Sequence, residues 1–181
     1  LYFFTSKEFL LGLVCVGTLL MIVLDVLKAY TYFFENLYRK LFQFILREEE
    51  KNFKKNLLTG GTYYAFGIFL SVLLFPKEVA IFAILVMIWC DTMAALFGKK
   101  FGVRKIIGDR TLIGSIAFLI TGLLVVVLLQ YVFPDYNFYN AGFITVVFAM
   151  MIEQVGVLKI NDNLVLPLFT GGIFLIINNI I

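Results

Sequence analysis

The run Trp89–Gly102 places an acidic side chain inside an apolar segment and continues into a basic one, with Lys99, Lys100, Arg104, Lys105 and Arg110 following. Asp91 lies late in a stretch long enough to cross a bilayer. A carboxylate at that depth costs at least about 2.5 kcal/mol to insert, so it indicates a functional site; helix packing, with Asp91 paired to a basic residue, is the alternative. Because Mg²⁺ takes one or two carboxylates together with phosphate oxygens and water, the run predicts a place where a phosphorylated molecule meets a lipid.

The end of this basic stretch opens the next apolar segment with hydroxyl groups. Thr111 and Ser115 lie one turn apart where a helix is expected to begin. Free backbone N–H groups at a helix start, with a hydroxyl and an arginine nearby, suit an anion, although Thr and Ser also serve as ordinary helix caps. The stretch contains neither GxxxxGK[ST] nor GxGxxG. We therefore predict a nucleotide site without a P-loop, in which four cations neutralise phosphate charge: Lys99, Lys100, Lys105 and Arg110.

Two further carboxylates are expected at the same depth as Asp91. Glu153 lies near the end of a second apolar run, and Asp162 follows in the polar turn that also contains Asn163. Asn-Asp-Asn is a common turn sequence, so these residues can also serve as a turn alone. Three carboxylates at one membrane surface predict a cluster that holds Mg²⁺ or Mn²⁺, or that acts as a general base. Asn163 and Arg47 are expected to contact the nucleotide.

The composition is that of a membrane protein. Of 181 residues, 62% are hydrophobic and 15% are charged, and the mean hydropathy is +0.99. The sequence contains no histidine, which excludes His-based metal sites, Ser-His-Asp and Cys-His triads, and phosphotransfer through histidine. Cys15 and Cys90 lie in apolar runs without the spacing of metal ligands, so we interpret them as packing residues.

Six apolar spans, each near the about 20 residues that a helix needs to cross the hydrocarbon core, follow one another along the chain. They are expected at Phe9–Thr31, Leu57–Phe75, Val79–Phe97, Leu112–Phe133, Ala141–Leu158 and Leu164–Ile181. The segment 32–56 fits an amphipathic helix at the membrane surface, or a solvated helical connector. In the first span, the spacing of Asp25 and Lys28 favours a structural ion pair. We therefore predict an all-α integral membrane protein that forms one polytopic domain over residues 1–181.

The basic residues divide unevenly between the two sides of these spans. Most of the fifteen lysines and arginines fall in alternate connections, at 32–56, 98–111 and 159–163. Cytoplasmic loops carry the excess of positive charge, so these connections are predicted to be cytoplasmic and both termini to lie outside. The loop 98–111 is the predicted nucleotide loop, and the carboxylates then face the cytoplasm. If the protein is bacterial, the membrane is expected to be the inner one.

The segments DTMAALFGKKFG, which starts at Asp91, and DRTLIGSIA, which ends at Ala117, carry a family resemblance. They resemble the CTP-dependent lipid kinases, which include the CTP-using diacylglycerol kinase, dolichol kinase and phytol kinase and are distantly related to the phosphatidate cytidylyltransferases. In that family an aspartate on a helix of small residues leads to a G-[KR]-K-[FY]-G loop and a K-[ST]-L-x-G-S-x-A helix start. Further segments agree in order: Arg47–Glu50 before Thr59–Gly60, Lys77–Ala80, and Glu153 followed by Asp162–Leu164 and Pro167. The chain departs from the pattern at Cys90, where glycine is frequent, at Arg110, where lysine is usual, and at Ile113, where glutamate is frequent.

The resemblance implies a membrane enzyme that transfers the γ-phosphoryl group of CTP, or of another nucleotide, to the hydroxyl of diacylglycerol or of a polyprenol. Its partners would be the nucleotide, Mg²⁺ and a membrane lipid, and no nucleic acid is expected. Phosphoryl transfer depends mostly on positioning and charge neutralisation, so a site without histidine is adequate. A cytidylyltransferase that makes a CDP-lipid is one alternative, and the products of the reaction would distinguish it from a kinase. A small transporter or flippase is another, although carboxylates gathered at one surface, without an inverted repeat in the sequence, argue against it.

Overall fold

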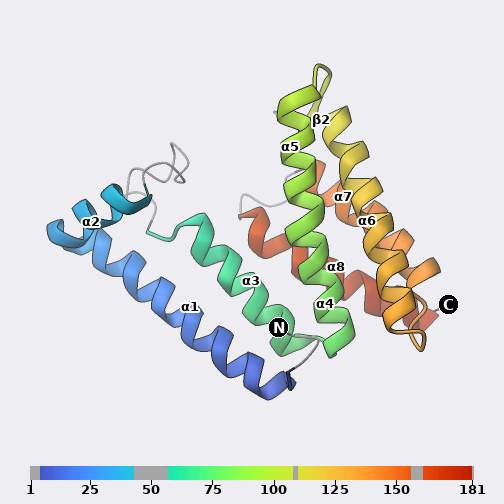
Figure 1. The fold of residues 1–181 in the computed structure, drawn as a ribbon, viewed down its shortest axis with the longest axis horizontal. Coiled ribbons are helices and arrows are strands. Elements are labelled where there is room, and N and C mark those ends of the chain that lie inside the picture. The colour runs from blue at the N-terminus through green and yellow to red at the C-terminus, as the bar shows by residue number, and fades with distance from the viewer. Residues whose placement is uncertain (1–4, 43–56, 108–109, 156–160, 181) are drawn as a thin grey trace. The chain divides into compact units, whose positions relative to one another are not determined.

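The computed structural model describes residues 5–42, 57–107, 110–155 and 161–180, and nearly all of them are helical (Figure 1). The chain divides into two compact units, Leu1–Phe69 and Leu70–Ile181. Each unit has its own packing and its own cluster of charged side chains. The single domain predicted over residues 1–181 stays a prediction.

The first unit consists of α1 (Lys7–Tyr30), α2 (Tyr32–Phe42) and most of α3 (Gly60–Leu74). The hydroxyl of Ser6 caps α1 by accepting a hydrogen bond from the N–H of Phe9 at 3.3 Å. Further along α1, the hydroxyl of Thr18 donates to the carbonyl of Ala65 on α3 at 3.3 Å. These contacts define where α1 begins and hold it against α3.

A sealed ion pair joins α1 to the start of α3. Nζ of Lys28 lies 2.6 Å from Oδ1 of Asp25, and Asp25 is only 1% exposed. The backbone N–H of Thr59 donates to Oδ2 of the same carboxylate at 2.7 Å, and the hydroxyls of Thr59 and Thr62 donate to it as well. The Lys28 ammonium also lies 4.6 Å from the ring centroid of Tyr38. The predicted structural ion pair is confirmed, and its carboxylate additionally caps the N-terminal end of α3, where negative charge is favoured.

The second unit contains a long helix from Lys77 to Phe101. It consists of α4 (Lys77–Leu85), a π-helical turn, η3 (Val86–Cys90), and α5 (Asp91–Phe101). A π-turn holds about one residue more than an α-helical turn, so it rotates the following residues by about 100° relative to an uninterrupted helix. The stretch 79–83 of α4 is fully buried, whereas most of α5 is not. The π-turn therefore separates a core segment from one that begins with Asp91.

This long helix packs against three others: α6 (Leu112–Val132), α7 (Phe143–Val155) and α8 (Asp162–Ile180). A second π-helical turn, η4 (Phe138–Gly142), precedes α7. α5 lies beside α6, α4 contacts α8, and α7 contacts both α6 and α8 (Figure 1). The buried rings of Phe82, Phe138 and Phe174 meet in this core, and the centroids of Phe138 and Phe174 are 4.8 Å apart. The aromatic contacts fix the helices relative to one another.

Small residues allow α5 and α6 to approach closely. A Cβ atom at Gly98 would lie 2.9 Å from the hydroxyl of Thr111, and one at Gly114 would lie 2.9 Å from the carbonyl of Ala94. Neither distance leaves room for a methyl group. The face of small residues that continues from Asp91 is therefore the surface on which these two helices pack.

The predicted loop 98–111 differs from the structure. α5 continues through Phe101, so Lys99 and Lys100 lie on its last turn, where positive charge favours a helix end. Strands β1 (Lys105–Ile107) and β2 (Arg110–Thr111) then pair in antiparallel fashion. This short hairpin is an exception to the otherwise helical fold, and it delivers Arg110 directly to the start of α6.

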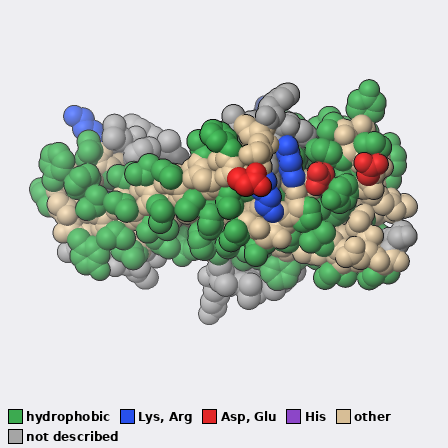
Figure 2. Space-filling view, turned by 90° about the horizontal axis from the view of Figure 1, so that it is seen from below, with side chains coloured by type: hydrophobic (Ala, Val, Ile, Leu, Met, Phe, Trp, Pro, Cys, Tyr) green, Lys and Arg blue, Asp and Glu red, His purple; other side chains and the backbone are tan. Residues whose placement is uncertain are grey.

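Within the described residues, four helices are long and apolar enough to cross a membrane: Lys7–Tyr30, Lys77–Phe101, Leu112–Val132 and Asp162–Ile180. α3 is apolar but shorter. Each of the six predicted spans contains a helix, and crossing by all six stays a prediction. α2 covers the start of the predicted surface segment, whose remainder, 43–56, lies outside the described residues. Many large hydrophobic side chains are exposed, and the face drawn in Figure 2 is mostly hydrophobic with few charges, as expected for an integral membrane protein.

Candidate functional site

One guanidinium joins three carboxylates that come from distant parts of the chain. Nη2 of Arg110 lies 2.7 Å from Oδ2 of Asp162, and Nη1 forms an ion pair with Oε1 of Glu153. Oδ1 of Asp91 is 3.9 Å from Nη1, near the limit of an ion pair. We call these four residues the Arg110 cluster. The structure thus brings together the three predicted metal or base residues and one of the four predicted phosphate ligands.

Each member of the Arg110 cluster lies at the end of a secondary-structure element or close to it. Asp91 is the first residue of α5, directly after the π-turn, and Asp162 is the first residue of α8. Arg110 begins β2, just before α6, and Glu153 lies in the last turn of α7. At the start of α8 the helix dipole favours the negative charge of Asp162. Ends of helices therefore converge on one place, where backbone packing fixes four charged side chains.

Exposure differs among the four side chains. Glu153 is only 3% exposed, and its carboxylate faces the guanidinium. The side chains of Arg110, Asp91 and Asp162 are between about 30% and 42% exposed. A buried acid paired with an arginine orients that arginine firmly, because separation would leave an uncompensated charge. The cluster thus has one sealed acid that holds Arg110 and two acids that a ligand can reach.

The hydroxyls of Thr111 and Ser115 are engaged within the protein. Oγ1 of Thr111 accepts a hydrogen bond from the N–H of Gly114 at 3.2 Å, which makes Thr111 the N-cap of α6. The hydroxyl of Ser115 donates to the Thr111 carbonyl at 3.1 Å and accepts from the side-chain amide of Gln154. Both residues are buried. Their contacts with phosphate stay predictions, and in this structure they fix the helix start that follows Arg110.

Gln154 is a residue that sequence reasoning missed. Its Nε2 donates to the hydroxyl of Ser115 and lies 3.5 Å from Oε2 of Glu153, so it ties α7 to the first turn of α6. Its Oε1 is buried and has no hydrogen-bond partner among the described residues. The sequence did contain a signal for it: Gln154 is an amide next to an acid in an otherwise apolar run. A polar group buried in such a run requires a hydrogen-bond partner.

The predicted lysines do not all face the Arg110 cluster. Lys100 follows Asp91 by nine positions in α5, about two and a half turns, so it lies on the opposite side of the helix. Its ammonium is 5.2 Å from the ring centroid of Phe101. Lys99 also lies on the last turn of α5, and Lys105 is an exposed residue of β1. Nucleotide contacts by these three lysines stay predictions.

The two remaining predicted residues lie next to the cluster or beyond the described part of the chain. Asn163 follows Asp162, and its backbone N–H donates to Oδ1 of Asn161 at 3.1 Å, which shapes the turn before α8. Its contact with a nucleotide stays a prediction. Arg47 lies outside the described residues.

The donor atoms of the Arg110 cluster suit a hard cation such as Mg²⁺, which prefers carboxylate and phosphate oxygens. Within the described part of the chain, no three acidic or other ligating side chains are arranged as a metal site. Mg²⁺ in nucleotide enzymes does not need such a cage, because one or two carboxylates suffice when phosphates and water complete the shell. Asp91 and Asp162 are the more exposed acids and fit that role, whereas Glu153 is buried. Arg110 pairs with both Glu153 and Asp162.

Comparison with known proteins reveals similarity to lipid kinases. The chain is 32% identical over 100 residues to CTP-dependent diacylglycerol kinase 1 of Schizosaccharomyces pombe, a match that covers 54% of the chain and 44% of the kinase. It is 28% identical over 125 residues to the protein of the same name from Saccharomyces cerevisiae, covering 67% of the chain and 42% of the kinase. This similarity supports the resemblance inferred from residues 91–117.

A bacterial relative matches over more of the chain. An uncharacterized protein of Rickettsia prowazekii is 29% identical over 172 residues, which covers 92% of the chain and 81% of the relative. The matches to the two yeast kinases span less than half the length of those proteins. No family model and no solved structure matches the chain.

Proposed function

We propose that this protein is a membrane lipid kinase that transfers the γ-phosphoryl group of CTP to the hydroxyl of a lipid alcohol. The observation that carries the proposal is the Arg110 cluster, in which a cation suited to phosphate meets acids suited to Mg²⁺ and to proton transfer. The names of the yeast relatives support CTP as donor and diacylglycerol as acceptor. A polyprenol or another isoprenoid alcohol is the second candidate acceptor.

Arg110 is the residue that we assign to the nucleotide phosphates. A guanidinium has five N–H donors in a rigid plane, so it can remain bound to Glu153 and still donate to a phosphate oxygen. Glu153 therefore acts as the positioning residue that orients Arg110. Asn163 and Lys105, which lie on the neighbouring elements, are the further nucleotide contacts that we propose.

The transfer step requires a proton acceptor as well as charge neutralisation. The oxygen of the lipid hydroxyl bonds to the γ-phosphorus, the bond from that phosphorus to the β–γ bridging oxygen breaks, and CDP leaves. We assign the hydroxyl proton to Asp162, the most exposed acid of the cluster. Asp91 is the proposed ligand of Mg²⁺, which when bound neutralises charge on the phosphates. Lipid phosphate and CDP are the products.

Analysis of the products tests the proposal directly. Purified protein in lipid nanodiscs is supplied with diacylglycerol, a polyprenol or phytol, and with CTP labelled at either the α or the γ phosphate. A kinase moves the γ label to the lipid and leaves the α label in CDP. Transfer of the α label to the lipid, with release of pyrophosphate, would identify a cytidylyltransferase instead. The absence of transfer to every acceptor and from ATP and GTP as well would contradict both enzymes.

The proposed orientation places this chemistry at the cytoplasmic surface. In a variant whose Cys15 and Cys90 are replaced by serine, single cysteines are introduced at Lys100, at Asn161 and at Tyr136. A membrane-impermeant thiol reagent should label the first two only from the cytoplasmic side and the third only from outside. Labelling of Lys100 and Tyr136 from the same side would refute the six-span topology.

A further inference from the structure

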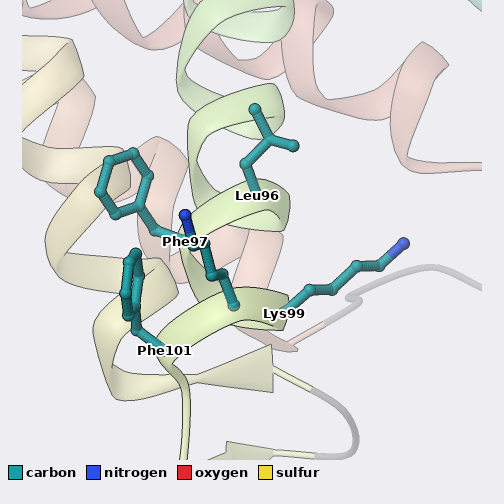
Figure 3. A pocket seen from close by; sticks show the side chains of 5 residues that line it. Leu96, Phe97, Lys99 and Phe101 are labelled. Atoms are coloured by element: carbon teal, nitrogen blue, oxygen red, sulfur yellow. The ribbon is translucent and has the colours of Figure 1, made fainter.

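A pocket of about 460 Å³ lies on the surface of α5 near its C-terminal end (Figure 3). The side chains that line it are Leu96, Phe97, Lys99, Lys100 and Phe101. The ring centroids of Phe97 and Phe101 are 5.8 Å apart, and the two rings form an apolar wall. All three apolar side chains are between 43% and 57% exposed. The pocket thus combines an apolar lining with two ammonium groups.

This pocket is separate from the Arg110 cluster. At about 100° per residue, Leu96, Phe97 and Lys100 lie on the half of α5 that points away from Asp91, and Lys99 and Phe101 lie at the two edges of that half. The half that includes Asp91 and Gly98 faces α6, because Gly98 packs against Thr111 and Gly114. A ligand in the pocket therefore binds on the outer side of α5, where it does not reach the carboxylates of the cluster.

The depth of the pocket follows from the length of its helix. The helix Lys77–Phe101 has 25 residues and is therefore about 37 Å long. The hydrocarbon core of a bilayer is about 30 Å thick. If Lys77 lies at one surface, then Lys99 and Lys100 lie in the headgroup layer of the other, and Leu96 lies next to the acyl chains. Lysine ammoniums at such a helix end extend to the headgroups while their stems lie along apolar surface.

We propose that this pocket binds an anionic phospholipid, whose phosphate contacts Lys99 and Lys100 and whose acyl chain lies on Leu96, Phe97 and Phe101. Charge complementarity supports this occupant. Neither lysine forms an ion pair within the described part of the chain, and the ammonium of Lys100 lies over the Phe101 ring. Basic residues next to a membrane-crossing helix attract anionic headgroups. The proposal concerns a lipid-binding site and does not depend on the catalytic role of the Arg110 cluster.

The single tryptophan provides a direct probe of this site. Trp89 lies in the π-turn seven positions before Leu96, about 10 Å away along the helix, and is 46% exposed. Brominated acyl chains quench tryptophan fluorescence only at close range. The full chain is reconstituted into phosphatidylcholine vesicles that contain increasing fractions of either brominated phosphatidylglycerol or brominated phosphatidylcholine. The relative association constant of the two lipids at Trp89 is then obtained from the quenching curves.

We expect phosphatidylglycerol to bind at least about fivefold more tightly than phosphatidylcholine, and high salt to reduce this preference. The double variant Lys99→Gln/Lys100→Gln should lose the preference to within about twofold. Lys77→Gln removes one lysine charge at the other end of the same helix and should leave the preference unchanged. Phe101→Ala should weaken the quenching by both lipids, because it removes apolar lining without changing charge.

Three results would overturn the proposal. One is equal quenching of the unchanged protein by both lipids. Another is an undiminished preference for phosphatidylglycerol in the double variant together with a higher KM for CTP. That result would show that Lys99 and Lys100 bind the nucleotide instead. The third is failure of either lipid to quench Trp89, which would show that lipid does not reach this face of the helix.

Discussion

The two units of the protein contain two charged clusters that are built in opposite ways. In the first unit, Asp25 and Lys28 form a one-to-one pair, sealed from solvent, and threonine donors surround the carboxylate. In the second, one guanidinium faces three carboxylates, two of which are partly exposed. Both clusters join distant helices, but only the second has charged groups that a dissolved ligand can reach.

The difference distinguishes a structural role from a chemical one. A buried pair whose hydrogen bonds are all satisfied gives a ligand nothing to bind, and separating its charges is strongly unfavourable. A cluster in which acids outnumber the cation and remain accessible can exchange partners with Mg²⁺ and phosphate. We therefore expect substitutions in the first cluster to affect stability and those in the second to affect turnover.

The largest expected effect is that of Asp25→Asn on folding. The neutral amide leaves Lys28 buried without its counter-ion, which should lower the free energy of unfolding by about 3 kcal/mol. For a chain of this size that corresponds to a fall in Tm of about 6 to 12 °C, measurable by thermal unfolding in detergent. Activity per folded molecule should stay unchanged. Adding Lys28→Met should recover part of the lost stability, and an unchanged Tm in Asp25→Asn would show that the pair is not structural.

Asp91→Asn should lower turnover and leave stability almost unchanged, the opposite of Asp25→Asn. An amide cannot offset the charge of Mg²⁺ and phosphates, so kcat should fall at least about 100-fold, equivalent to about 2.7 kcal/mol of transition-state stabilisation. The Tm should stay within about 2 °C of the unchanged protein, and activity of the unchanged protein should vanish in EDTA and return with Mg²⁺ or Mn²⁺. Asp135→Asn is the matched control outside the cluster. Near-normal turnover of Asp91→Asn would refute its role as metal ligand.

Arg110→Ala should have a smaller effect on turnover. Losing the guanidinium should raise the KM for CTP or lower kcat by about tenfold or more. Arg110→Lys should recover only part of this, because lysine supplies charge without the planar fork of donors. Arg104→Ala removes a neighbouring arginine and should behave like the unchanged protein. If Arg110→Ala inserts normally and turns over as fast as the unchanged protein, the nucleotide site lies elsewhere.

Gln154→Leu should have the smallest effect, a decrease in kcat of about threefold. We assign Gln154 to positioning, because its amide links α7 to the helix start that carries Arg110. A double-mutant cycle tests this role: the decrease should disappear when Gln154→Leu is added to Arg110→Ala, since the group that Gln154 positions is then absent. Additive effects would show that Gln154 contributes only to packing.

The sequence predicted the helices and the charged pairs better than it predicted their connections. Apolar runs located a helix in each expected span, and the spacing of Asp25 and Lys28 predicted their ion pair, because both signals are local. The charge pattern placed Asp91, Glu153 and Asp162 at one surface, and the structure brings them to one guanidinium. Their roles in catalysis stay predictions.

Long-range packing accounts for what the sequence did not predict. Gly98 suggested the start of a loop, but it lies inside α5 because a glycine there allows α6 to approach. That continuation turns Lys100 away from Asp91. The contribution of Gln154 depends on a contact with Ser115, which lies on another helix. Local propensity contains no information about either contact.

The π-helical turn Val86–Cys90 carries one residue more than an α-helical turn of the same long helix. Deleting one residue there would allow an ordinary α-helical turn to form, and Asp91 and the glycine face of α5 would keep their direction, because the chain would still complete one turn. Deleting one residue from α4 instead would rotate everything beyond it by about 100°. A one-codon deletion at 86–90 should therefore leave the site aligned, whereas one at 79–85 should turn Asp91 away from its partners.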